Sequence, residues 1–72
     1  MKLWIARDKN NTLGIYDAKP ELYCDEWGCE EWVVCDHYSQ HIYLNNELFP
    51  EVTFENSPQM VELKLIENET RR

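Results

Sequence analysis

The feature that most constrains the fold is a two-residue alternation of apolar side chains near the start of the chain, within the sequence KLWIARDKNNTLGIYD. Leu3 and Ile5 are two positions apart, and so are Leu13 and Ile15. Each pair therefore falls on one face of a strand, and the turn-forming residues DKNN separate the two runs. This segment predicts a β-hairpin that ends before Pro20, because proline has no N–H to donate to a strand ladder.

The middle of the chain predicts a second hairpin. Residues 32–38 (WVVCDHY) and 41–44 (HIYL) are rich in β-branched and aromatic residues, and SQ lies near the tip between them. Residues 21–31 contain few large apolar side chains, so we interpret them as an irregular segment, either a loop or a ragged sheet edge. An Asn cap followed by Pro50 predicts a single helical turn near residues 45–49.

Residues 58–68 fit two interpretations. Ser57 and Pro58 resemble the start of a helix, whereas Val61, Leu63 and Leu65 alternate as in a strand. The alternation is the better signal and favours a C-terminal strand.

Together these segments predict a small, mainly β fold. We expect a single domain over residues 1–72, formed by an antiparallel sheet of four to five strands from two hairpins and a C-terminal strand. Residues 68–72 are expected to fray. A domain of this size buries only about 60% of its unfolded surface, so disulfides, a metal or a partner often supplement its core.

Charge is segregated along the chain. Residues 20–63 hold none of the seven Lys and Arg residues and ten of the 14 Asp and Glu residues, in a chain of net charge −7. Nucleic acid is disfavoured as a direct ligand, because binding phosphates requires Lys and Arg to displace counterions.

The N-terminus MKLWIARDKN lacks the apolar run of a secretory signal, and no segment reaches the roughly 18–20 apolar residues of a membrane span. We therefore expect a cytoplasmic protein without membrane contact. In that reducing compartment Cys24, Cys29 and Cys35 would be thiols or metal ligands and not disulfides.

Two segments carry a resemblance to a known group of proteins. KLWIARDKNNTLGIYDAKP and LFPEVTFENSPQMVELKLIE resemble short uncharacterised proteins of gut Bacteroides-type bacteria and of their phages and mobile elements. The resemblance covers both ends, about half of the chain, with a variable middle. It implies a small intracellular protein from mobile or accessory genes, and it implies no activity, ligand or catalytic residue.

The cysteines and histidines of the middle segment form a candidate zinc site. Cys24, Cys29, Cys35 and His37, with His41 as a spare, provide thiolate and imidazole ligands. The spacing argues against zinc, because structural sites use paired C-x2–4-C knuckles and no second matched pair is present. We expect no cofactor, and a zinc-stabilised mini-domain remains an alternative.

The run DEWGCEEW predicts a binding face. Trp27 and Trp32 would anchor a partner, and the surrounding carboxylates would attract a basic one. Alternatively, Trp32 is core at the head of a strand, which we favour for that residue, and Trp27 covers the sheet edge. For Trp27 both interpretations stay open. The candidate carboxylates are Asp25, Glu26, Glu30 and Glu31.

Catalysis finds little support. Cys35 could pair with His37 or His41, but side chains two apart on a strand lie roughly 7 Å from each other and no third orienting group is evident. Glu30 and Glu31 are adjacent and should diverge in space, and no Gly-rich phosphate loop or hydrolase motif occurs.

We therefore expect a non-enzymatic protein-interaction module or accessory subunit whose partner has a basic surface. A further alternative is an acidic mimic of nucleic acid that inhibits a nucleic-acid enzyme in a phage or mobile-element setting.

Overall fold

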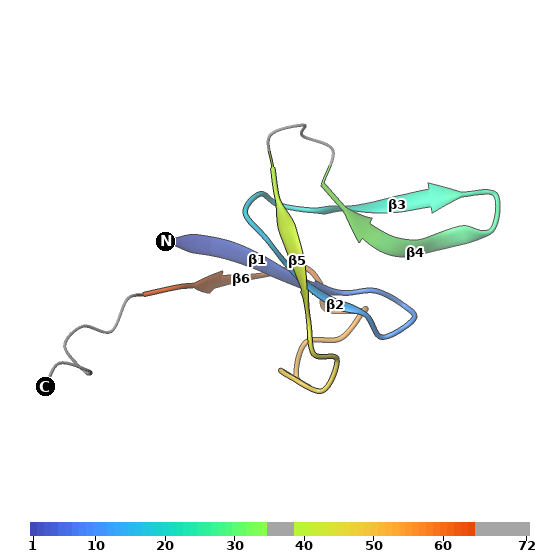
Figure 1. Cartoon of the computed structure of the whole chain (residues 1–72). Coiled ribbons are helices and arrows are strands. Elements are labelled where there is room, and N and C mark those ends of the chain that lie inside the picture. Colours follow the sequence, from blue (N-terminus) through green and yellow to red (C-terminus); the bar gives the residue numbers. More distant parts are fainter. Residues whose placement is uncertain (35–38, 65–72) are drawn as a thin grey trace, which may run out of the picture.

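The computed structural model describes residues 1–34 and 39–64 and contains six strands in two antiparallel sheets. The larger sheet has the order β5-β2-β1-β6, and β3 pairs with β4 alone (Figure 1). The described residues contain no helix, so the predicted mainly β fold is confirmed. The strands are β1 (Lys2–Arg7), β2 (Leu13–Tyr16), β3 (Glu21–Asp25), β4 (Gly28–Val33), β5 (His41–Leu44) and β6 (Gln59–Glu62).

The N-terminal hairpin forms as the alternation predicts. β1 and β2 pair with Ile5 opposite Ile15, which brings the aliphatic side chains to one face. The N–H of Asp8 donates to the carbonyl of Thr12 at 2.8 Å and closes the loop. Asn11 adopts a positive φ of 81° within it, a conformation that asparagine tolerates better than most residues.

The core lies on the aliphatic face of the larger sheet. Ile5 and Leu13 are buried there with Val52, which comes from the loop between β5 and β6. Leu44 and Val61 pack against this cluster while partly exposed. The core is small because the loop covers only one end of the face.

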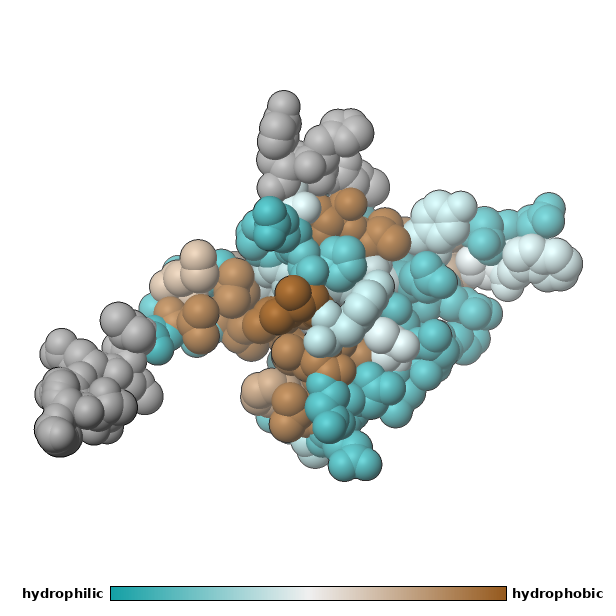
Figure 2. Space-filling model, in the orientation of Figure 1, coloured by the Kyte–Doolittle hydropathy of each residue, from teal (hydrophilic) through white to brown (hydrophobic). Residues whose placement is uncertain are grey.

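The other predicted core positions are less buried. Leu3 and Ile15 are half-buried and Leu63 is exposed, while Leu65 lies outside the described residues. Figure 2 shows hydrophobic side chains gathered over the larger sheet, with hydrophilic ones dominating the β3–β4 hairpin.

A buried arginine fixes the β5–β6 loop, residues 45–58, against β1. The Arg7 side chain is only 7% exposed, and its guanidinium donates to five backbone carbonyls and one side-chain amide. The shortest of these contacts joins Nε to the carbonyl of Val52 at 2.6 Å. The charge is thus solvated by carbonyl dipoles, which makes its burial tolerable. The carbonyls belong to Asn11, Asn46, Leu48, Phe49 and Val52.

The C-terminal segment is a strand where it is described. β6 pairs antiparallel with β1, with Val61 opposite Leu3, and Leu63 continues the pairing by exchanging hydrogen bonds with Met1. The helical alternative is therefore wrong for residues 58–64, and residues 65–68 lie outside the described part, as does the predicted frayed tail.

The second predicted hairpin is wrong. β5 pairs with β2, placing Leu44 opposite Leu13. Of the segment 32–38, Trp32 and Val33 end β4, which pairs with β3, and residues 35–38 lie outside the described part. Residues 21–31 are accordingly strands joined by a tight turn and not an irregular loop. They escaped prediction because all of β3 and most of β4 are exposed, so no buried face imposes an apolar alternation.

The predicted helical turn at residues 45–49 is a hydrogen-bonded turn instead. The Leu48 N–H donates to the carbonyl of Asn45 at 3.0 Å, and the Asn45 side chain accepts from the Glu47 N–H at 2.8 Å. The asparagine thus stabilises an isolated turn, as it does in Asx turns, without starting a helix.

The β3–β4 hairpin, residues 21–33, projects from the sheet as an arm (Figure 1). Principal extents of 56 × 28 × 16 Å reflect this elongated shape. Within the described part of the chain, three hydrogen bonds attach its base to the body: the Lys9 N–H to the Glu30 carbonyl at 3.0 Å, the Trp32 N–H to Asp8 Oδ1 at 2.9 Å and the Tyr16 hydroxyl to the Trp32 carbonyl at 3.3 Å. The arm is thus anchored at one end and open to solvent along its length.

Candidate interaction site

One face of the arm combines aromatic rings with carboxylates. Tyr23 and Asp25 are two apart on β3, and Glu31 lies opposite Tyr23 on β4, so all three side chains share a face. Together with Trp27 and Glu30 they line a cavity of about 220 Å³. We call these five residues the acidic-aromatic face.

A β-bulge brings the adjacent residues Glu30 and Glu31 to the same cavity. The register passes from Tyr23 opposite Glu31 to Cys24 opposite Cys29, so Glu30 is an extra residue on β4. The expectation that these carboxylates diverge is therefore wrong, because the bulge suspends strict alternation at this point. Glu30 Oε2 lies 3.8 Å from the position a Cβ on Gly28 would occupy, which places it beside the turn.

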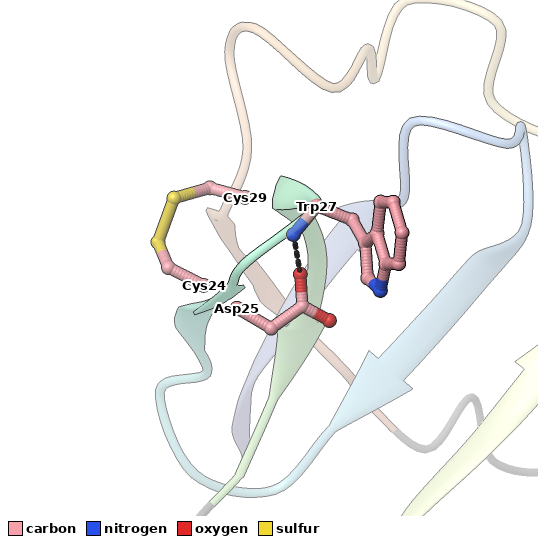
Figure 3. The surroundings of a disulfide bond; sticks show 4 residues. All are labelled: Cys24, Asp25, Trp27 and Cys29. Atoms are coloured by element: carbon pink, nitrogen blue, oxygen red, sulfur yellow. Dashed lines mark hydrogen bonds between the residues drawn. A yellow bond between two sulfur atoms is a disulfide. The ribbon is translucent and has the colours of Figure 1, made fainter.

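The tight turn at the tip of the arm presents Trp27 to solvent. Asp25 Oδ1 accepts a hydrogen bond from the Trp27 N–H at 2.8 Å, an Asx turn that fixes the loop (Figure 3). Gly28 follows at a φ of 126°, which a residue with a side chain rarely adopts. Trp27 remains 80% exposed. Tryptophan is enriched at interfaces, where a partner covers the ring.

The opposite face of the arm holds a disulfide between Cys24 and Cys29, with 4.0 Å between their Cα atoms. Figure 3 shows the disulfide on one side of the hairpin tip and the Trp27 ring on the other. The expectation that both cysteines are thiols or metal ligands is therefore wrong. They face each other because antiparallel pairing places them directly across the ladder, beside the two-residue turn.

The candidate zinc ligands are not brought together among the described residues. Cys24 and Cys29 are bonded to each other, and Cys35 and His37 lie outside the described part. His41 stacks on Tyr16 with ring centroids 5.4 Å apart. Within residues 1–34 and 39–64, no three Cys, His, Asp or Glu side chains form a group that could hold a metal ion.

Two predicted site residues lie apart from the cavity. Trp32 occupies the face opposite Glu31, is half-buried, and packs at a tilt against Phe54 with ring centroids 6.2 Å apart. Its backbone makes two of the three contacts at the base of the arm, so it serves to attach the arm. Glu26 is exposed in the turn and adds charge at the tip without lining the cavity.

Buried polar groups hold the base of the arm. Burial raises the pKa of the Asp8 carboxyl above its ordinary value, against the opposing effects of the Trp32 N–H and of His41. Burial, reinforced by the nearby charge of Asp8, raises the pKa of Tyr16 to about 12. The Tyr16 ring crosses Gly14, where an added Cβ would lie 2.9 Å from the Tyr16 hydroxyl, so a larger residue there would require the ring to shift.

Sequence reasoning missed Tyr23 as a member of the face. The only signal in the sequence was that Tyr23 lies next to Cys24 and two residues before Asp25. Once residues 21–25 are recognised as a strand, this spacing places Tyr23 and Asp25 on the same face.

Comparison with family models, with curated proteins and with solved structures finds no match for this chain. The resemblance of its two ends to short Bacteroides-type and phage proteins therefore stays a prediction. In the described part of the chain, no helix has the length and apolar character needed to cross a membrane.

Proposed function

We propose that the protein is a non-catalytic, cytoplasmic interaction module whose arm docks a basic segment of a partner protein. The observation that carries this proposal is the acidic-aromatic face, where two aromatic rings and three carboxylates line one open cavity on a projecting hairpin. The partner is a protein, because the same carboxylates repel nucleic acid and anionic lipid.

Electrostatics favours a cationic ligand at this face. The arm holds five Asp or Glu residues and no Lys or Arg, so no positive side chain within it offsets the carboxylates. Charges of one sign in a concave surface steer an oppositely charged partner and accelerate association. Lys or Arg side chains entering the cavity would meet carboxylates and the faces of Trp27 and Tyr23 together.

Trp27 is the expected energetic centre. Hot spots are enriched in tryptophan and are surrounded by residues that exclude water while contributing little themselves. In a native complex we expect Trp27→Ala to cost roughly 2 kcal/mol or more, the usual threshold for a hot spot. Its exposed position at a turn means that truncation removes binding surface and leaves the core intact.

A pair of double variants with identical net charge tests the proposal. Glu30→Gln with Glu31→Gln alters the face, whereas Glu51→Gln with Glu62→Gln alters exposed positions on the body. A fluorescein-labelled hexa-arginine peptide serves as the probe, with binding followed by anisotropy at two salt concentrations. We expect the first pair to weaken binding and flatten its salt dependence, and the second pair to leave both nearly unchanged.

Trp27→Ala adds an independent readout with the same peptide. A cation–π contact at an exposed site contributes up to about 1 kcal/mol, so we expect roughly fivefold weaker binding. If both double variants weaken binding equally and Trp27→Ala has no effect, the peptide senses net charge alone and the face is not a docking site.

The acidic mimic of nucleic acid remains a second candidate, because the arm concentrates carboxylates without interspersed bases. A mimic would bind a nucleic-acid enzyme and not a basic peptide segment. If the protein bound a purified nuclease or polymerase at its nucleic-acid channel, and duplex DNA competed with that binding, mimicry would be favoured.

A further inference from the structure

The disulfide is placed where it controls the shape of the acidic-aromatic face. Cys24 and Cys29 flank the turn that presents Trp27, and each is a sequence neighbour of a cavity residue, Asp25 and Glu30 respectively. Both cysteines are exposed, so a thiol in solution can reach the sulfur atoms.

Apart from the strand ladder and the hydrogen bond between the Trp27 N–H and Asp25, little else holds the tip of the arm together. A two-stranded hairpin without a buried face is marginally stable in water, and all five residues of β3 are exposed. Among the described residues, the three hydrogen bonds with the body reach only Glu30 and Trp32, on the base side of the disulfide. The bulge between the Tyr23 and Cys24 pairs further interrupts the ladder at the point where the tip begins.

We propose that the Cys24–Cys29 disulfide is a redox switch for the docking face: oxidised, it holds Trp27 and the carboxylates in one binding arrangement, and reduced, it releases the tip. This rests on the proposed function of the face. In a reducing cytosol, disulfides are uncommon and those that form are mostly transient or redox-sensing, which suits a bond that is accessible to solvent.

The reductant is a dithiol. One of its thiolates attacks a sulfur of the pair, the S–S bond breaks, and a mixed disulfide forms. The second thiol of the reductant then displaces the remaining protein thiolate and closes the reductant's own disulfide. The cysteine pair thereby gains two electrons and two protons, which the dithiol loses.

The redox state is measured first. Alkylation with iodoacetamide, followed by mass spectrometry, should find one reactive thiol in the oxidised chain of three cysteines and three after treatment with dithiothreitol. A Cys35→Ser variant should show no reactive thiol before treatment with dithiothreitol and two after it. This variant also removes any disulfide exchange with the third cysteine. Three reactive thiols in protein purified under air, or a pair that dithiothreitol cannot reduce, would overturn the switch.

The hexa-arginine peptide then reports on the face in the Cys35→Ser background. We expect reduction to weaken binding roughly tenfold, because the apparent dissociation constant rises as the competent fraction of the tip falls. Replacing Cys24 and Cys29 by Ser should reproduce the reduced affinity and abolish the response to dithiothreitol. Slow amide hydrogen exchange in β1 and β2, unchanged on reduction, should show that the body stays folded.

The outcomes separate the two proposals. Equal binding by the oxidised and reduced forms overturns the switch and leaves the docking face standing. Failure of the oxidised form to bind the peptide overturns the docking face, and the switch with it. Loss of slow amide exchange in β1 and β2 on reduction also overturns the switch, because the disulfide would then support the whole domain and not the tip alone.

Discussion

Among single side chains, Tyr16 best shows how burial and hydrogen bonding determine where the arm attaches. Its ring is buried across Gly14, stacks on His41, and donates its hydroxyl hydrogen to the Trp32 carbonyl. A tyrosinate at this position would lose the hydrogen bond and would lie near Asp8. The neutral phenol is therefore favoured in the folded state.

Replacing Tyr16 by Phe should destabilise the domain by about 1 kcal/mol, the net contribution of a typical hydrogen bond. The pKa of Tyr16 is raised from 10.0 to about 12 in the folded state. The contribution of Tyr16 to the free energy of unfolding is therefore present in full below pH 10 and is lost as the pH rises through 12. The difference in the free energy of unfolding between wild type and Tyr16→Phe should therefore decrease over that pH range.

Urea denaturation at neutral pH measures this cost, and absorbance at 295 nm should show a tyrosinate step near pH 12 that Tyr16→Phe lacks. Tyr43→Phe is the matched control, since the Tyr43 ring is 62% exposed. Equal destabilisation by the two substitutions would contradict the assigned role of the Tyr16 hydroxyl.

The β5–β6 loop is the element whose position depends most on one residue. It has no regular secondary structure, yet it supplies Val52 to the core, and its carbonyls converge on the Arg7 guanidinium. The planar guanidinium of arginine carries five N–H donors in a fixed arrangement, whereas a lysine ammonium carries three at a single atom.

Replacing Arg7 by Met should therefore destabilise the domain by roughly 3 kcal/mol or more, because a buried network loses its donor and its carbonyls lose their partners. Lys9→Met removes the same charge from an exposed side chain and should have little effect. The urea midpoints of the two variants test this prediction, and the midpoint of Arg7→Met should be much the lower. Similar midpoints would show that the guanidinium does not organise the loop.

Prediction from the sequence succeeded for strands that pack on the core. β1, β2 and β6 alternate because their aliphatic side chains meet a core, and their alternation identified them. The arm has no buried face and gave no such signal. The pairing of β5 with β2 is a long-range contact, so local composition suggested a partner adjacent in sequence instead.

The candidate site was predicted only in part, because residue composition is visible in the sequence whereas strand pairing is not. The acidic and aromatic composition pointed to Asp25, Trp27, Glu30 and Glu31, which share the cavity. The division of the two tryptophans between opposite faces depends on strand register, and the convergence of the two glutamates depends on a bulge. Neither register nor bulge is encoded in residue spacing alone.

The molecule as a whole divides into a sheet with a small core and an arm without one. Opening of the body must expose Ile5, Leu13 and Val52, whereas opening of the tip exposes almost no new apolar surface. Free energies of local opening follow such differences in burial. We therefore expect amide hydrogens of the tip to exchange by local opening and those of β1 and β2 to exchange only with global unfolding.

Hydrogen exchange followed by NMR should show this division in wild-type protein whose Cys24–Cys29 disulfide is reduced, with the amides between Cys24 and Glu30 exchanging much faster than those of β1. Ile5→Ala should cost roughly 2–5 kcal/mol by leaving a cavity in the core. It should accelerate exchange in β1 and β2 while hardly changing the tip, which already opens on its own. Trp27→Ala should leave the exchange rates of β1 and β2 unchanged, because the Trp27 side chain contacts solvent and not the core.

If Ile5→Ala accelerated amide exchange in the tip and in the sheet by the same factor, arm and body would unfold as one cooperative unit, and the tip could not respond independently to a partner or to reduction.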